Sequence, residues 1–345
     1  MNSLERVSLT LQHKEADHVP VYPLINSISR NYTGINYATW SRDTELCAKS
    51  IIKATEYLDL DIVCSLVDLS VEAADFGQKI KYPENEAAHP DHNNRLIKSI
   101  EEYKNIEPIN PRKTPRMSEH IRLCDLLVKA KGTEKPVIGF VFAPLGVVSM
   151  LRGQQEMFMD ALDDPDIIHS ALEAVTQTLI EYTTALMETG VHGIMLDTLY
   201  ASQSIMSKDM WNTLEGPYVE RLAKHIHNSD CMVMIHNCGN GAYFDVQIER
   251  MKPEAISFLH LPDDCKSFAE VKEKYGKKTT LIGHVSPSFI ISATPQQVEQ
   301  ECRQQIDTFK KGGGFVLATG CEYPANATDD SAKVMVETAK TYGRF

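Results

Sequence analysis

The sequence lacks the features of a membrane-spanning, exported or nucleic-acid-binding protein. It contains no run of about 18 apolar residues, the length of a transmembrane helix. Its 35 Lys and Arg residues are outnumbered by 47 Asp and Glu residues, and the net charge of −12 argues against binding to nucleic acids or anionic membranes. Residues 1–20 have no apolar core behind a basic start and do not resemble a signal peptide. We therefore expect a cytoplasmic protein.

Closely spaced cysteines are also absent. The eight cysteines are scattered along the chain, and no C-x-x-C pair typical of a structural zinc site occurs. In a reducing compartment a disulfide framework is not expected. Most of the cysteines lie within apolar patterns, as buried free thiols do. A cysteine in any other setting is therefore a candidate for metal binding or catalysis.

A dinucleotide-binding G-x-G-x-x-G motif is missing as well, which argues against an open, doubly wound sheet. Instead, eight short apolar runs alternate with stretches of helical period. Eight parallel strands, buried on both faces, are the number that closes a (β/α)8 TIM barrel, and this is the predicted fold. The strands are expected within residues 18–24, 61–66, 135–142, 192–197, 231–238, 255–261, 280–285 and 314–321.

The helical stretches and one irregular segment complete the predicted organisation. Thr294, Pro295 and Gln297 have the spacing of a capping box with proline in the first turn, so a helix is expected to begin there. We expect one domain over residues 1–345, with an irregular insertion around 82–117 that is a candidate cover for the active site. Helices are expected within 163–190, 208–229, 266–276, 294–312 and 328–343.

Metal-ligating side chains occur where two of the predicted strands end. In "MVMIHNCGNG", His236 and Cys238 are two residues apart and share one side of a strand, and Cys321 ends the last apolar run. A barrel carries its chemistry at the C-terminal ends of its strands, so these residues face the same mouth. One nitrogen and two sulfurs suit Zn²⁺, with a fourth position left open for catalysis or filled by Asp197 or Glu322. The alternative is a packed histidine beside a buried thiol.

Two further strand ends carry candidate catalytic residues. Asp197 ends the fourth apolar run and is predicted to act as a transient fourth ligand or to orient a bound thiol. His284 ends the seventh run and is predicted to hydrogen-bond a cofactor or the anionic end of a substrate. The alternative for both residues is that they brace loops.

Five segments give the chain a resemblance to a known family, the uroporphyrinogen decarboxylase superfamily. The resemblance covers nearly the whole chain and implies a (β/α)8 barrel. The segments are "VFAPLGVVSMLRG" (141–153), "METGVHGIMLDTLYAS" (187–202), "MIHNCGN" (234–240), "LIGHVSPS" (281–288) and "GGFVLATGCEYPANA" (313–327).

The chain departs from the decarboxylase branch of that superfamily. Those enzymes carry an early P-V-W-x-M-R-Q-A-G-R segment that grips the carboxylates of the tetrapyrrole, whereas this chain has "VPVYPLINSISRNYTG" with Arg30 alone. The corrinoid-dependent methyltransferase branch, which includes methylcobamide:coenzyme M methyltransferases, carries H-x-C and a later cysteine as zinc ligands. This resemblance maps the ligands onto His236, Cys238 and Cys321.

The resemblance implies a zinc-dependent methyltransferase that moves a methyl group between a corrinoid and a small acceptor or donor, with a thiol such as coenzyme M as the leading candidate. No D-x-H-x-x-G cobalt-ligand motif occurs, so methylcobalamin is expected to arrive free or on a corrinoid protein. Folates, methoxy compounds and methylamines, the direction of transfer and the oligomeric state stay open. The alternatives are a tetrapyrrole decarboxylase and a noncatalytic corrinoid- or tetrapyrrole-binding barrel.

Overall fold

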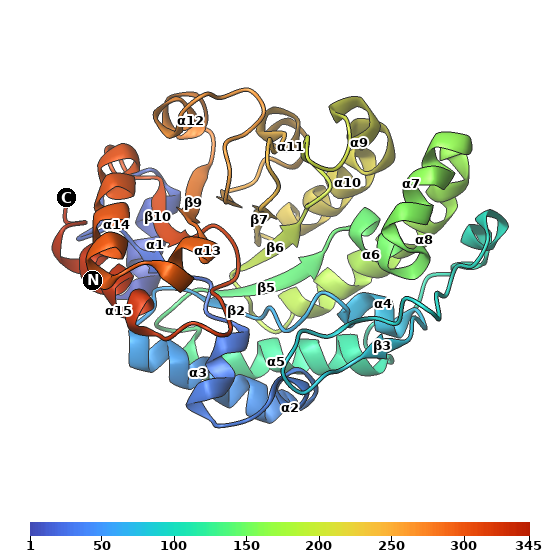
Figure 1. The fold of residues 1–345 in the computed structure, drawn as a ribbon, viewed down its shortest axis with the longest axis horizontal. Helices are drawn as coiled ribbons and strands as arrows, with labels where there is room; N and C mark the ends of the chain where they lie inside the picture. Colours follow the sequence, from blue (N-terminus) through green and yellow to red (C-terminus); the bar gives the residue numbers. More distant parts are fainter.

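An eight-stranded parallel sheet, curled and surrounded by helices, forms the centre of the computed structural model, which describes residues 1–345 (Figure 1). The strand order is β1-β10-β9-β8-β7-β6-β5-β2. Each of the eight predicted runs contains one strand, so the predicted barrel is confirmed. The strands are β1 (Val21–Tyr22), β2 (Val63–Cys64), β5 (Val137–Phe142), β6 (Gly193–Asp197), β7 (Met232–Asn237), β8 (Ala255–Phe258), β9 (Thr280–Val285) and β10 (Phe315–Thr319).

Asp61 joins the two ends of the sheet. Its backbone amide donates to the Val21 carbonyl at 3.1 Å, and its carboxylate accepts the Val21 amide at 2.9 Å. The same carboxylate pairs with Arg6 at 2.7 Å. Arg6 belongs to α1 (Ser3–Leu11), and Val7 of this helix packs into the barrel's inner apolar cluster. Helix α1 therefore covers the N-terminal end of the barrel and leaves the C-terminal end as the mouth.

Alternate side chains of the strands fill the lumen below that mouth. Met195 of β6 and Met234 of β7 belong to an inner cluster of 13 buried apolar residues. Two residues further along each strand, Asp197 and His236 point to the same side and are partners in the β6–β7 ladder. The apolar layer thus forms the floor on which the first polar layer of the mouth lies.

Helices cover the outside of the sheet, with α3 and α5 on one side and α10 to α12 on the opposite side in Figure 1. None of them is both long and apolar enough to cross a bilayer. The helices after α1 are η1 (Ser27–Tyr32), α2 (Tyr37–Arg42), α3 (Thr44–Leu58), α4 (Val71–Asp75), η2 (Ile100–Asn105), α5 (Pro115–Lys131), α6 (Pro144–Arg152), α7 (Gln154–Asp163), α8 (Pro165–Met187), α9 (Lys208–Leu214), α10 (Gly216–His227), α11 (Phe244–Met251), α12 (Phe268–Tyr275), α13 (Pro287–Ser292), α14 (Pro295–Phe309) and α15 (Asp330–Thr341).

Two of the predicted helical stretches show how local chemistry sets helix boundaries. The stretch 208–229 is not one helix but two, α9 and α10, because Pro217 has no amide hydrogen to continue the first helix. At the start of α14 the predicted capping box forms. The Thr294 amide donates to the Gln297 side chain at 2.8 Å, and the Gln297 amide donates to the Thr294 hydroxyl at 3.3 Å.

The segment 82–117 is attached to the barrel wall by few regular elements. Strand β4 (His89–Pro90) pairs antiparallel with β3 (Ile80–Lys81), and η2 follows before α5 begins at Pro115. Tyr103 of η2 is buried, and its hydroxyl donates to Asp160 of α7 at 3.0 Å. The part that this segment plays in covering the mouth stays a prediction.

Candidate metal centre

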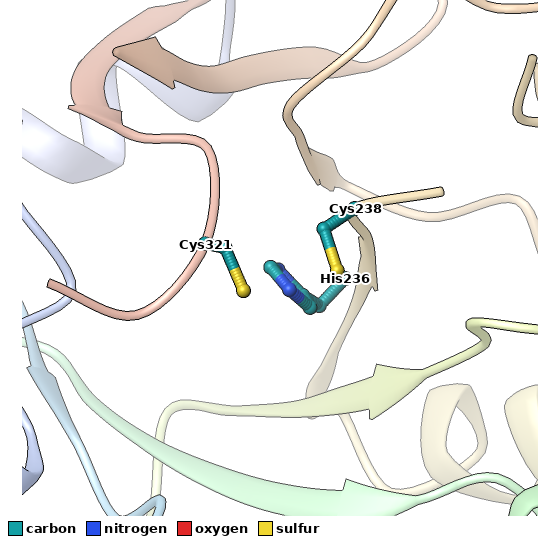
Figure 2. A group of neighbouring side chains, drawn as sticks. All are labelled: His236, Cys238 and Cys321. Atoms are coloured by element: carbon teal, nitrogen blue, oxygen red, sulfur yellow. The ribbon is translucent and has the colours of Figure 1, made fainter. Parts of the chain in front are cut away.

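Three side chains from two separate strand ends meet at the barrel mouth. His236 lies near the end of β7, Cys238 follows that strand, and Cys321 lies two residues beyond β10. One ligand atom from each residue lies within 4.8 Å of the others. Figure 2 shows Cys321 reaching from the loop after β10 toward His236 and Cys238. The structure therefore brings together the three residues that were predicted as metal ligands.

The exposure of the cysteines singles out the same two thiols. All eight cysteines are free; six are buried, and Cys238 and Cys321 are the two that are partly exposed. Burial raises the pKa of the other thiols, for example that of Cys64 to about 11. Cys238 and Cys321 are therefore the thiols that an ion or a small molecule can reach from solvent.

A hydrogen bond orients the His236 ring. His236 is 5% exposed, and its Nδ1 atom lies 3.0 Å from the hydroxyl of Ser257, its ladder partner on β8. With Nδ1 occupied in this way, Nε2 is the nitrogen that is free to bind a ligand. Sequence reasoning missed Ser257, although its lumen-facing position in the apolar run 255–261 was the available signal.

The two thiols have opposite protonation tendencies. Hydrogen bonding with Cys238, and also with His236, lowers the pKa of Cys321, whereas the interaction with Cys321 and burial raise the pKa of Cys238. A thiolate is thus favoured at one sulfur even before a metal binds. The ligand atoms of a tetrahedral zinc site lie about 3.6–3.8 Å apart, given its bond lengths. The three donors, grouped within 4.8 Å, fit such an ion in both spacing and softness.

Two carboxylates flank the three candidate ligands. Asp197 is 5% exposed, its Oδ1 atom has no hydrogen-bond partner, and burial raises its pKa to about 6 against the opposing effect of His236. Glu322 accepts the Ser27 backbone amide at 2.7 Å, and burial raises its pKa. Asp197 therefore lies beside the candidate ligands, as the ladder partner of His236, and the catalytic role predicted for it stays a prediction.

His284 is held in an aromatic cluster. Its ring stacks on Phe268 of α12 with 3.6 Å between centroids, and Phe258 and Phe309 lie at 5.6 and 5.7 Å. Burial lowers its pKa to about 4, so the ring is neutral at pH 7. Its backbone amide donates to Gln305 at 2.8 Å. The role predicted for His284 in binding a corrinoid or a substrate stays a prediction.

Comparison with known proteins identifies the family. The family model for uroporphyrinogen decarboxylase (URO-D) matches residues 2–342. The methylcobamide:CoM methyltransferase MtbA of Methanosarcina mazei is 22% identical over 342 residues, 98% of this chain and 97% of that protein. The uroporphyrinogen decarboxylase of Vesicomyosocius okutanii is 19% identical over 316 residues, 90% of this chain and 88% of that protein.

Among solved structures, a methyltransferase from Methanosarcina mazei superposes with a TM-score of 0.85 at 20% identity, over 99% of both chains. At that identity the likeness concerns the fold, and it agrees with the barrel described above. Because the family model spans almost the full sequence, the chain belongs to the uroporphyrinogen decarboxylase (URO-D) family.

Proposed function

We propose that the protein is a zinc-dependent methyltransferase that moves a methyl group between a corrinoid and a small thiol, for which coenzyme M is the reference candidate. The observation that carries this proposal is the meeting of His236 with the two partly exposed thiols, Cys238 and Cys321, at the barrel mouth. The similarity to MtbA, whose name describes transfer from a methylcobamide to coenzyme M, supports the same chemistry.

In this proposal His236, Cys238 and Cys321 hold the ion, and a fourth position is left for the substrate. Zinc bound there supplies a Lewis acid that lowers the pKa of a thiol, which is otherwise mostly protonated at neutral pH. Ser257 keeps Nε2 of His236 directed at the ion through its contact with Nδ1. Asp197 orients the substrate from the side of β6, and His284 stabilises the mouth from the side of β9.

The transfer itself is a balanced nucleophilic displacement. The thiol gives up its proton to solvent, and a sulfur lone pair forms the new bond to the methyl carbon. The carbon–cobalt bond breaks with both electrons remaining on cobalt, so Co(III) becomes Co(I) and the thiol becomes a thioether. The barrel residues position the sulfur and exclude water on the floor side, where the lumen is filled by apolar side chains. The corrinoid arrives free or on a partner protein.

Decarboxylation of a tetrapyrrole is the disfavoured alternative within the family. A substrate with eight carboxylates requires several cations, yet Arg30 is the one arginine in the segment between β1 and α2. The Arg30 guanidinium already donates to the Ser27 carbonyl at 2.9 Å and lies 5.7 Å from the centre of the Tyr37 ring. In a noncatalytic corrinoid-binding barrel the three candidate ligands would hold a structural metal, but structural zinc sites usually have four protein ligands, and only three meet here.

A methyl-transfer assay tests the proposed function. Purified protein loaded with one equivalent of zinc is mixed with methylcobalamin and a thiol, and loss of the methyl–cobalt absorption is followed together with thioether formation. We expect turnover that is lost in Cys238→Ala and retained in Cys302→Ala, because Cys302 is a buried cysteine on α14 and is not one of the candidate ligands. Binding of methylcobalamin without any transfer would favour the noncatalytic alternative.

A further inference from the structure

Asp197, near the candidate metal centre, differs from the other buried carboxylates of this protein. Glu72 and Glu215 accept hydrogen bonds from backbone amides. Asp61, Asp68 and Asp160 each have an arginine partner at 2.7 Å. Asp197 and Glu322 have no ion-pair partner, although both are close enough to act electrostatically on His236. The charge of Asp197 also contributes to the raised pKa of Cys238. The mouth therefore carries two negative side chains that the protein itself does not neutralise.

Hydrogen-bond acceptors without donors accompany these charges. Oδ1 of Asp197 and Oδ1 of Asn26 are both buried and have no partner, and their residues are 5% and 1% exposed. Asn26 precedes Ser27, whose amide donates to Glu322, so Asn26 lies next to the residue that binds the second carboxylate. Buried acceptors are rarely left unpaired in native proteins. The donor that Asp197 lacks is expected on the molecule that binds at the mouth.

Few positively charged side chains lie near the mouth. Among the strongest charge effects on Asp197, Glu322 and the three candidate ligands, the one contribution from Arg or Lys is that of Arg30 on Glu322. Arg30 is committed to the Ser27 carbonyl and to the face of Tyr37. The charges of the two cysteine thiolates cancel the charge of a bound divalent ion. The carboxylates of Asp197 and Glu322 then leave the surroundings of the reacting sulfur with a net negative charge.

We propose that the thiol substrate carries a positively charged, hydrogen-donating group such as an ammonium within a few atoms of its sulfur, and that Asp197 binds this group. This inference rests on the proposed function and narrows its substrate class. Coenzyme M has a sulfonate two carbons from its sulfur, and that anion would meet Asp197 and Glu322 with no free cation beside it. The preferred substrate of this chain therefore differs in charge from coenzyme M.

Three thiols with the same two-carbon skeleton test the inference: 2-aminoethanethiol, 2-mercaptoethanol and 2-mercaptoethanesulfonate. With zinc-loaded protein and methylcobalamin at pH 7, kcat/KM is expected to fall in that order, by about tenfold or more from the ammonium to the sulfonate. Calorimetric titration of the zinc-loaded protein with each thiol, without methylcobalamin, gives an independent measure and should show the same order of affinity.

A matched variant separates the effect of the protein from the intrinsic reactivity of each thiol. Asp197→Asn keeps the size of the side chain and removes its charge, so the ratio of kcat/KM for the ammonium and sulfonate thiols should fall by about tenfold. Glu322→Gln keeps the acceptor for Ser27 and serves as the second variant where Asp197→Asn does not fold or loses zinc. Glu72→Gln, a buried carboxylate bound to the Phe142 amide, should leave the ratio unchanged.

The outcomes distinguish the two proposals. Transfer to the sulfonate thiol in preference to the ammonium thiol, with a ratio that Asp197→Asn and Glu322→Gln do not change, overturns the inference and leaves the methyltransferase proposal intact. Loss of that sulfonate preference in Arg30→Gln would assign the mouth to anions instead. No transfer to any of the three thiols by zinc-loaded protein overturns the proposed function, and the inference fails with it.

Discussion

Replacing Ser257 with alanine should weaken zinc binding without removing a ligand. The Ser257 hydroxyl is the partner of Nδ1 of the buried His236 ring, at 3.0 Å. Its removal leaves a buried ring nitrogen unpaired, at a cost of about 1–3 kcal/mol, and frees the ring to turn its other nitrogen away from the two sulfurs. Loss of such an outer partner typically lowers metal affinity by about 10- to 100-fold, and we expect a decrease in that range.

Competition with a chromophoric zinc chelator measures this affinity directly, and thermal unfolding of the metal-free protein measures the fold separately. Ser65→Ala is the matched control, because the Ser65 hydroxyl makes a similar buried contact to Nε2 of His120 at 2.8 Å, away from the candidate ligands. Both variants should lose comparable stability, but only Ser257→Ala should lose zinc affinity. Equal zinc affinity in Ser257→Ala and wild type would refute the role assigned to this hydroxyl.

Three more predictions concern the barrel and the choice of chemistry. Asp61→Ala removes a buried partner of Arg6 and of the Val21 amide, and should lower the free energy of unfolding by about 3–5 kcal/mol in urea titration; a loss below about 1 kcal/mol would contradict its closing role. Burial raises the pKa of Glu72 to about 8, above the 4.5 of the unfolded chain, so the folded state binds the extra proton and stability falls as pH rises from about 4.5 to 8. Glu72→Gln keeps the acceptor for the Phe142 amide and should be more stable than wild type at pH 8 but not at pH 4.5, as followed by thermal unfolding; parallel pH profiles would count against this. Incubation with uroporphyrinogen should yield no coproporphyrinogen above the uncatalysed rate by chromatography, because the arginine segment is missing, and enzymatic product would reverse the choice of branch.

The strands of the barrel and the three candidate ligands could be predicted because their signals are local. A strand buried on both faces must be apolar along its whole length, so each of the eight runs marks its strand. The side of a strand alternates with a period of two, which puts His236 and Cys238 together once β7 is known. The C-terminal ends of all strands share one mouth, which adds Cys321 from the far side of the barrel.

Other features depend on contacts that no local pattern records. The position of His284 at a strand end did not reveal that its ring would pack against Phe268 and Phe309, which come from two separate helices. In the sequence, Ser257 is one polar residue within an apolar run. Its contact with His236 becomes evident only when β7 and β8 are paired in register. The helix break at Pro217, by contrast, was visible in the sequence, because proline cannot continue the hydrogen bonding of a helix.

The charge of the mouth is a property of the assembled barrel as well. Asp197 and Glu322 are 125 positions apart in the chain, and neither lies beside a run of like charge in the sequence. The assembled structure leaves both without an arginine partner, whereas Asp61, Asp68 and Asp160 each have one. The charge of the substrate is therefore inferred from side-chain contacts in the structure, whereas the metal ligands were predicted from residue types in the sequence.

X-ray absorption at the zinc edge, recorded before and after addition of 2-aminoethanethiol, tests the central claim most directly. In the protein alone we expect one zinc ion per chain, with two sulfur ligands from Cys238 and Cys321 and one imidazole nitrogen from His236. Addition of the thiol should raise the number of sulfur ligands from two to three, as the substrate sulfur takes the open position. A protein that holds no zinc, or whose zinc keeps the same sulfur count at saturating thiol, would contradict the proposed chemistry.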